Sequence, residues 1–177
     1  MSMIIRRVLV EETYDYAVCH MDCWRSAYKG IMPDEYLSNM SSGIESRAER
    51  SVQIISESCN PYEYLCVTYD EKMIGKLGFG KCLDEDKGEA GQIYAMYLID
   101  EFWDRGFGRK MMEYALNNLK EMGYDEVVIW VLEENDRARR FYEKFRFETD
   151  GKKEELNIGK PLVQVRYVLC ITDLIFL

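Results

Sequence analysis

The sequence predicts an α+β fold in which a mixed central β-sheet of about seven strands is flanked by helices. Three observations support this fold. Short runs rich in β-branched and aromatic residues recur along the chain, as strands require. Longer segments between several of them carry apolar residues at helical spacing. Residues 92–147 show the clearest order, which is strand, glycine turn, helix, strand and helix.

The N-terminal part is predicted to be mainly helical. A first strand at Met3–Val8 is followed by a helix over Glu12–Tyr28, and the break at Gly30–Pro33 ends that helix. A short helix then reaches Leu37, and a third helix to about Ser56 is capped by Ser41 or Ser42. Related faces of the long first helix hold five polar or aromatic residues: Tyr16, Cys19, His20, Cys23 and Trp24.

The remaining strands follow from turn chemistry and apolar runs. Strands at Tyr64–Tyr69 and Met73–Lys81 are joined by Asp70-Glu71-Lys72, which suits a hairpin turn. An acidic loop at Asp84–Glu89 leads to the next strand. The expected elements beyond it are strand Gln92–Leu98, helix Arg109–Met122, strand Glu126–Leu132, helix Asp136–Phe145, and an antiparallel pair at Phe147–Thr149 and Leu162–Leu169.

Length and charge limit the classes of function. At 177 residues, the chain is expected to form one domain over 1–177. The formal net charge of −9 argues against nucleic acid as a partner and suits a cationic small substrate. No apolar run is long enough to cross a membrane, so we expect a cytoplasmic protein without a membrane partner.

The cysteine pattern predicts neither a metal site nor a disulfide framework. The six cysteines form no Cys-x-x-Cys pair. Cys19 and Cys23 lie one helical turn apart, which favours two small buried residues over a metal clip. The other four are scattered along the chain: Cys59, Cys66, Cys82 and Cys170.

The segment Asp104–Arg109 is a candidate anion cradle. Gly106 and Gly108 lie just before a predicted helix, where glycines let backbone N–H groups approach a phosphate. Arg105, Arg109 and Lys110 either add positive charge there or are solvated residues of the helix start. No third glycine follows at the dinucleotide-binding spacing and no Gly-Lys-Ser/Thr follows, so neither of those phosphate motifs is present. Taken alone, the glycines favour a plain turn.

Residues 92–147 as a whole resemble the GNAT superfamily of N-acetyltransferases. Trp103–Gly108 fills the family's pyrophosphate-loop pattern except at its first position, where Trp103 replaces Arg or Gln. The resemblance extends to segments 24–30 and 33–37, which look like the N-terminal helices of one bacterial subgroup, and to Val165–Tyr167. Arg146 replaces a glycine that many members have after the last helix. Four further positions match on and before that helix: Asn135, Ala138, Phe141 and Tyr142.

The resemblance implies that acetyl-CoA is the co-substrate. In the family, two parallel strands splay apart to form the acetyl-CoA cleft, and here they correspond to Gln92–Leu98 and Glu126–Leu132. Asn135 would contact the pantetheine arm, or cap the following helix, or do both. The implied cofactor-binding residues are Met96, Tyr97, Leu98, Asp104, Arg105, Gly106, Phe107, Gly108, Arg109, Asn135 and Ala138.

The resemblance also implies catalytic roles. Tyr142 occupies the position of the general acid that protonates the coenzyme A sulfur, and this role is favoured over the alternative of a core aromatic like Phe141. Where several members have a basic Glu, this chain has Gln92, which can orient a water but cannot accept a proton. Glu89 is the nearest upstream carboxylate and a candidate base, or simply a solvated loop residue. His20 fits a partly buried structural histidine better than a catalytic one.

The acceptor would be a primary amine of a small molecule or a peptide. Trp24, Tyr28 and Tyr36 are candidate wall residues that could hold a cation against their rings, or core residues. Tyr94 shares a strand face with Gln92. The leading function is acetyl transfer to the amine by direct attack in a ternary complex. The alternative is an acyl-CoA sensor or regulatory module with little turnover, and a homodimer is compatible with either.

Overall fold

The computed structural model describes residues 2–56 and 63–172, so Cys59 lies outside the described residues. The chain divides into two compact units. Unit 1 comprises residues 1–78 and 95–112, and unit 2 comprises residues 79–94 and 113–177. Within the described part of the chain, none of the helices combines the length and apolar character needed to span a membrane.

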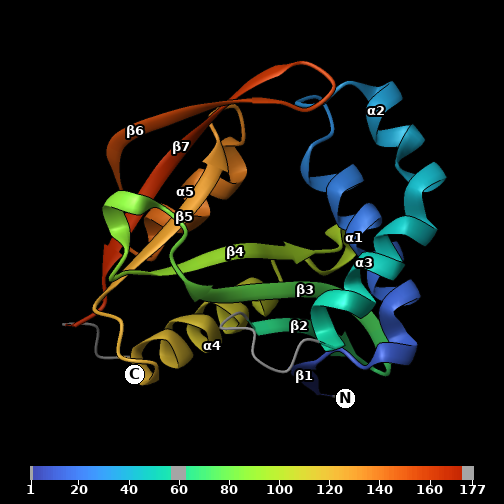
Figure 1. Ribbon diagram of the computed structural model, residues 1–177, viewed down its shortest axis with the longest axis horizontal. Helices are drawn as coiled ribbons and strands as arrows, with labels where there is room; N and C mark the ends of the chain where they lie inside the picture. Colours follow the sequence, from blue (N-terminus) through green and yellow to red (C-terminus); the bar gives the residue numbers. More distant parts are fainter. Residues whose placement is uncertain (1, 57–62, 173–177) are drawn as a thin grey trace. The chain divides into compact units, whose positions relative to one another are not determined.

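A mixed seven-stranded sheet confirms the predicted fold class (Figure 1). Its strand order is β1-β2-β3-β4-β5-β7-β6. β4 and β5 are parallel, whereas β1–β2, β5–β7 and β6–β7 are antiparallel. The strands are β1 Met3–Arg7, β2 Glu63–Tyr69, β3 Lys72–Lys81, β4 Gly91–Leu98, β5 Glu126–Leu132, β6 Glu148–Asn157 and β7 Pro161–Cys170.

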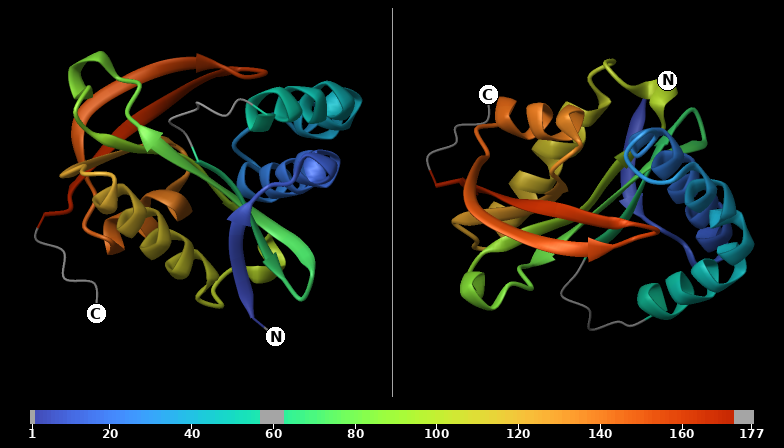
Figure 2. Two further views of the ribbon diagram at one scale, coloured as in Figure 1. Left: turned by 60° about the horizontal axis from the view of Figure 1, so that its bottom comes forward. Right: turned by 90° about the horizontal axis from the view of Figure 1, so that it is seen from above.

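Unit 1 contains the N-terminal helices, of which α1 (Thr13–Ala27) and α3 (Ile44–Ser56) lie side by side (Figure 2). The short helix α2 spans Asp34–Asn39. The predicted serine cap of the third helix is wrong, because Ser41 and Ser42 lie in a 3₁₀ turn before Ile44. Their hydroxyls instead donate to the backbone carbonyls of Ser38 and Asn39 at the end of α2.

The predicted β2–β3 hairpin is confirmed. Asp70 and Glu71 both have positive φ, 55° and 66°, as the two central residues of a type I′ turn require. Below α1, a core cluster joins Val8, Tyr16 and Cys66. This packing fixes the register of α1 against the strands of unit 1.

α4 (Phe107–Glu121) begins in unit 1 and ends in unit 2. In unit 2, Ala115, Leu116 and Leu119 are fully buried, as their helical spacing predicts. A second core cluster of this unit joins Cys82, Ala90 and Val128. α5 (Asp136–Lys144) follows β5 as expected.

The closing strand pair is longer than the sequence predicts. β6 continues from Glu148 to Asn157 rather than ending at Thr149, and it forms a long hairpin with β7 (Figure 2). Most of its side chains are exposed on both faces, so the alternation of apolar and polar residues that marks a half-buried strand is missing. Backbone pairing with β7, rather than side-chain burial, defines this strand.

Candidate functional site

The glycine loop of unit 1 has the backbone of a tight turn before a helix. Asp104 and Gly106 adopt positive φ, 56° and 83°. A Cβ added to Gly106 would meet no atom within 4 Å, so the outer side of the backbone is open at this residue. Because α4 begins at Phe107, the N–H groups of its first turn extend from the helix N-terminus beside Gly106.

Aromatic packing positions a cation at this loop. The Phe107 ring is buried, with centroids 5.6 Å from Phe102 and 5.1 Å from Tyr69. The Arg105 guanidinium lies over two of these rings, 5.2 Å from Phe102 and 5.6 Å from Phe107. Since a cation over an aromatic face is held in place without a carboxylate partner, the positive charge stays available at the turn.

Trp103 connects the loop to the end of β4. Its indole N–H donates to the Leu98 carbonyl over 2.8 Å. At the same place β3 approaches closely, because a Cβ on Gly75 would lie 2.5 Å from the Tyr97 carbonyl oxygen. Trp103, which replaces the Arg or Gln of the family pattern, therefore forms a hydrogen bond that connects the loop to β4.

Three residue pairs define the parallel register of β4 with β5. Gly91 pairs with Val127, Gln92 with Val128 and Ile93 with Ile129. Both strands continue past this point, β4 to Leu98 and β5 to Leu132. The parallel strands expected from the sequence are therefore present, and their register covers the first half of β4.

The Gln92 side chain is buried and hydrogen-bonded within unit 2. Its side chain is 8% exposed, and its Oε1 accepts a hydrogen bond from the Leu83 N–H over 3.0 Å. On the same strand face, the Tyr94 hydroxyl donates to the Lys81 carbonyl. Glu89 is exposed on the preceding loop. Gln92 and Tyr94 thus both hold the segment that leaves β3, and the Nε2 of Gln92 is its remaining donor group.

Asn135 caps α5, which is one of the two roles predicted for it. Its Oδ1 accepts from the Ala138 N–H over 3.1 Å, so both predicted positions take part in one cap. One helical turn further, Tyr142 is buried on α5, with its ring 5.8 Å from Phe141 and 6.1 Å from Phe147. After α5, Arg146 adopts a positive φ of 66°, a conformation that glycine adopts more easily.

Two of the predicted wall residues belong to an aromatic group in unit 1. Trp24 and Tyr28 have ring centroids 5.0 Å apart, and the Tyr28 and Tyr97 hydroxyls share a 2.9 Å hydrogen bond. His20 joins the group 5.0 Å from Trp24 and 5.8 Å from Tyr97. Tyr36 lies half-buried on α2, apart from these ring contacts.

His20 is neutral at physiological pH. Burial, and then the charges of Lys76 and Arg47, lower its pKa to about 3. His20 is partly buried, as expected, but its buried Nδ1 has no hydrogen-bond partner among the described residues. A group that stays neutral from pH 5 to pH 9 cannot act as a base that titrates in that range.

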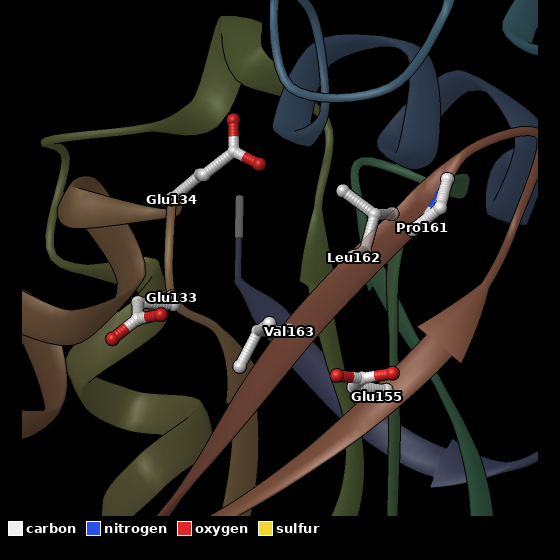
Figure 3. A pocket seen from close by; sticks show the side chains of 6 residues that line it. All are labelled: Glu133, Glu134, Glu155, Pro161, Leu162 and Val163. Carbon is white, nitrogen blue, oxygen red and sulfur yellow. The ribbon is translucent and has the colours of Figure 1, made fainter.

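Unit 2 also contains a pocket of about 210 Å³ at the ends of its strands (Figure 3). Glu133 and Glu134 follow β5, Glu155 lies on β6, and residues 161–163 of β7 complete the lining. Glu133 pairs with Lys153 over 2.5 Å, and the hydrogen bond from this lysine lowers the pKa of the carboxyl group. The lining carboxylates were not singled out from the sequence, although two of them directly precede Asn135.

The comparisons with known proteins decide the family. The model of the Acetyltransferase (GNAT) family matches residues 22–147, from α1 through the glycine loop to the third residue after α5. The chain belongs to this family. Among its described residues, no group of three or more His, Cys, Asp or Glu side chains is arranged to hold a metal ion.

Two curated relatives are named N-acetyltransferases. The uncharacterized N-acetyltransferase YuaI of Bacillus subtilis is 28% identical over 170 residues, which covers 89% of this chain and 92% of the relative. A probable N-acetyltransferase of Mycobacterium tuberculosis is 28% identical over 136 residues, 77% of this chain and 74% of the relative.

A solved structure shows the same fold. The PaiA N-acetyltransferase of Thermoplasma acidophilum, in complex with coenzyme A, superposes with a TM-score of 0.72 at 21% identity. The match covers 93% of this chain and 98% of that protein. The relatives therefore agree with the family match, and this structure agrees with the fold.

Proposed function

We propose that this GNAT-family acetyltransferase moves an acetyl group from acetyl-CoA to a primary amine of a small molecule or peptide, by direct attack in a ternary complex. The family match over residues 22–147 carries the proposal, because it includes the glycine loop, Asn135 and Tyr142 in one segment. The complex of the PaiA enzyme with coenzyme A supports the choice of co-substrate.

The pyrophosphate of acetyl-CoA would bind at the turn Asp104–Arg109. The open backbone at Gly106 and the start of α4 supply N–H donors, and Arg105 supplies positive charge. The backbone of Met96–Leu98 would bind the pantetheine arm as an added strand does. On Asn135, the Oδ1 is occupied by the α5 cap, which leaves the Nδ2 as the donor toward the cofactor.

Acyl transfer requires a neutral amine, a polarised carbonyl and a proton for the departing thiolate. Tyr142 would supply that proton, since a phenol with a pKa near 10 is protonated at neutral pH. Gln92 would order a water through its Nε2 rather than accept a proton. The alternative function, an acyl-CoA sensor with little turnover, is favoured by one feature only, the amide of Gln92 in place of a basic carboxylate.

Gly108→Val is expected to lower coenzyme A affinity at least tenfold, about 1.4 kcal/mol. The branched side chain would stand in the first turn of α4, where the phosphates must approach the backbone. Isothermal calorimetry with coenzyme A measures the change. Gly43→Val is the matched control, because Gly43 lies next to the first residue of α3 and has open space around it. Equal affinities in the two folded variants would remove the loop from the proposed site.

The pH dependence of kcat/KM tests how the amine loses its proton. A free alkylamine has a pKa near 10, so only about one molecule in a thousand is neutral at pH 7. The rate is expected to climb through pH 8 and 9, because His20 does not titrate there and Gln92 has no proton to exchange. The measurement compares the parent with Glu89→Gln. A plateau near neutrality that disappears in this variant would identify Glu89 as the base.

A further inference from the structure

One stripe of α1 carries buried polar atoms that lack partners. Tyr16, His20 and Trp24 recur every four residues and so share a face of the helix. The Tyr16 hydroxyl, the His20 Nδ1 and the Trp24 Nε1 are each buried without a hydrogen bond among the described residues. The Nε of Arg47 on α3 is buried and unpartnered in the same way. Such atoms are rare in folded proteins, because each one loses its bonds to water without compensation.

A lysine with no carboxylate partner completes this group. The Lys76 Nζ, from β3, lies 4.0 Å from the centre of the Tyr16 ring. Among the described residues, no carboxylate oxygen lies within ion-pair distance of it, and burial lowers its pKa to about 8. We call these five residues the α1 polar cluster: Tyr16, His20, Trp24, Arg47 and Lys76.

The charge of this cluster is positive and has no counter-ion within it. After burial, the charges of Lys76 and Arg47 lower the pKa of His20, so both cations lie near the same imidazole. The other groups that act on Lys76 are the thiols of Cys19 and Cys23, which hydrogen-bond to each other. Asp22 is the carboxylate that acts on these thiols, and it is half-exposed and paired with Arg25 over 3.3 Å.

The cluster adjoins the strand segment proposed for the pantetheine arm. Tyr97 lies between Met96 and Leu98 on β4, and its ring is 5.8 Å from His20 and 6.2 Å from Trp24. All of these residues belong to unit 1. A ligand that reached the cluster would therefore lie beside the backbone where the acyl end of the cofactor is expected.

We propose that the acceptor amine carries a carboxylate or phosphate group, and that the α1 polar cluster binds this anion. Lys76 and Arg47 supply the charge, while the Tyr16 hydroxyl and the Trp24 indole N–H supply hydrogen bonds. Burial raises the pKa of Tyr16, which keeps its hydroxyl protonated as a donor. This inference rests on the proposed acetyl transfer and narrows its substrate class, in contrast to the purely cationic acceptor that the net charge of the chain favours.

Four amines of similar size test the proposal: β-alanine, 2-aminoethyl phosphate, propylamine and 1,3-diaminopropane. With acetyl-CoA fixed and free thiol as the readout, at least one of the two anionic amines should exceed propylamine at least tenfold in kcat/KM. Comparing the two anionic amines distinguishes carboxylate from phosphate. Equal values for all four amines, or preference for the diamine, would overturn the proposal.

Lys76→Met assigns the effect to the cluster. It removes the charge but keeps an unbranched side chain, so the ratio of kcat/KM for the anionic amine to that for propylamine should fall at least tenfold. Lys72→Met is the matched control, because Lys72 lies on the same strand but is exposed and 3.6 Å from Glu101. A preference that survives in Lys76→Met would contradict the assignment.

A binding measurement separates this inference from the proposed function. If no amine is acetylated although coenzyme A binds, the proposed transfer fails. Thermal unfolding with propionate or inorganic phosphate, against sodium chloride at equal ionic strength, then reads the anion site without turnover. The midpoint should rise with one of the two anions in the parent and in Lys72→Met, and not in Lys76→Met. No rise in the parent would overturn the anion site itself.

Discussion

Tyr142→Phe is expected to lower kcat about 100-fold, or about 2.7 kcal/mol, while coenzyme A affinity stays within twofold of the parent. The substitution removes only the hydroxyl. The ring is buried between Phe141 and Phe147 at ordinary aromatic distances, and phenylalanine keeps that packing. The loss therefore falls on the step that needs the proton, which is departure of the coenzyme A thiolate.

Single-turnover kinetics and calorimetry on the same preparation separate chemistry from binding. Tyr114→Phe is the matched control, because Tyr114 lies half-buried on α4 and its ring packs edge-on to Phe79 at 6.3 Å. Its kcat should stay within threefold of the parent. If Tyr142→Phe turns over as fast as this control, Tyr142 is a core residue and the thiolate takes its proton from another donor.

The parts of the fold that could be predicted are those whose side chains show a regular pattern. α4 and β5 were placed correctly because their apolar residues follow helical spacing and a β-branched run. The extent of β6 could not be predicted, since its strand character comes from backbone pairs with β7. The predicted serine cap of α3 was wrong because the hydroxyls of Ser41 and Ser42 bond backward to carbonyls at the end of α2.

The residues of the site could likewise be predicted only where the local sequence specifies their contacts. Asn135 as a helix cap was expected, because the residue type and its place before a helix specify that bond. Lys76 and Arg47 could not be connected with α1 from the sequence. Lys76 occupies a strand position where a lysine is normally solvated, and its burial depends on α1 packing over β3. Contacts between residues distant in the chain leave no local signal.

The same reasoning applies to Arg166 in unit 2, whose side chain is only 4% exposed. The loop between β3 and β4 supplies Asp84 and Asp86, each 2.8 Å from its guanidinium. β6 supplies Asp150, 2.7 Å from the Arg166 Nε. The acidic loop, interpreted from the sequence as a connection, is thus one half of a buried ion-pair network whose other half lies about eighty residues later.

Hydrogen bonds from Arg166 and Lys152 hold the Asp86 pKa well below its usual range. For Asp150, burial pushes the pKa up, but the bond from Arg166 and further contacts outweigh burial and lower it. A carboxylate with a depressed pKa stabilises the fold fully above its unfolded pKa near 3.9, and this contribution is lost as pH falls through the folded value.

Arg166→Leu is therefore expected to lower the free energy of unfolding at pH 7 by about 3 kcal/mol, because the partly buried carboxylates of Asp84 and Asp150 lose the buried cation that they share. Urea unfolding measures the loss. Lys152→Met, which removes an exposed partner of Asp86, is the control and should cost under about 1 kcal/mol. The gap between parent and Arg166→Leu should stay constant from pH 7 to about 5 and narrow below about 4 as the carboxylates protonate. A gap that is small at pH 7, or equally large at pH 3, would show that the network does not stabilise unit 2 through its charges.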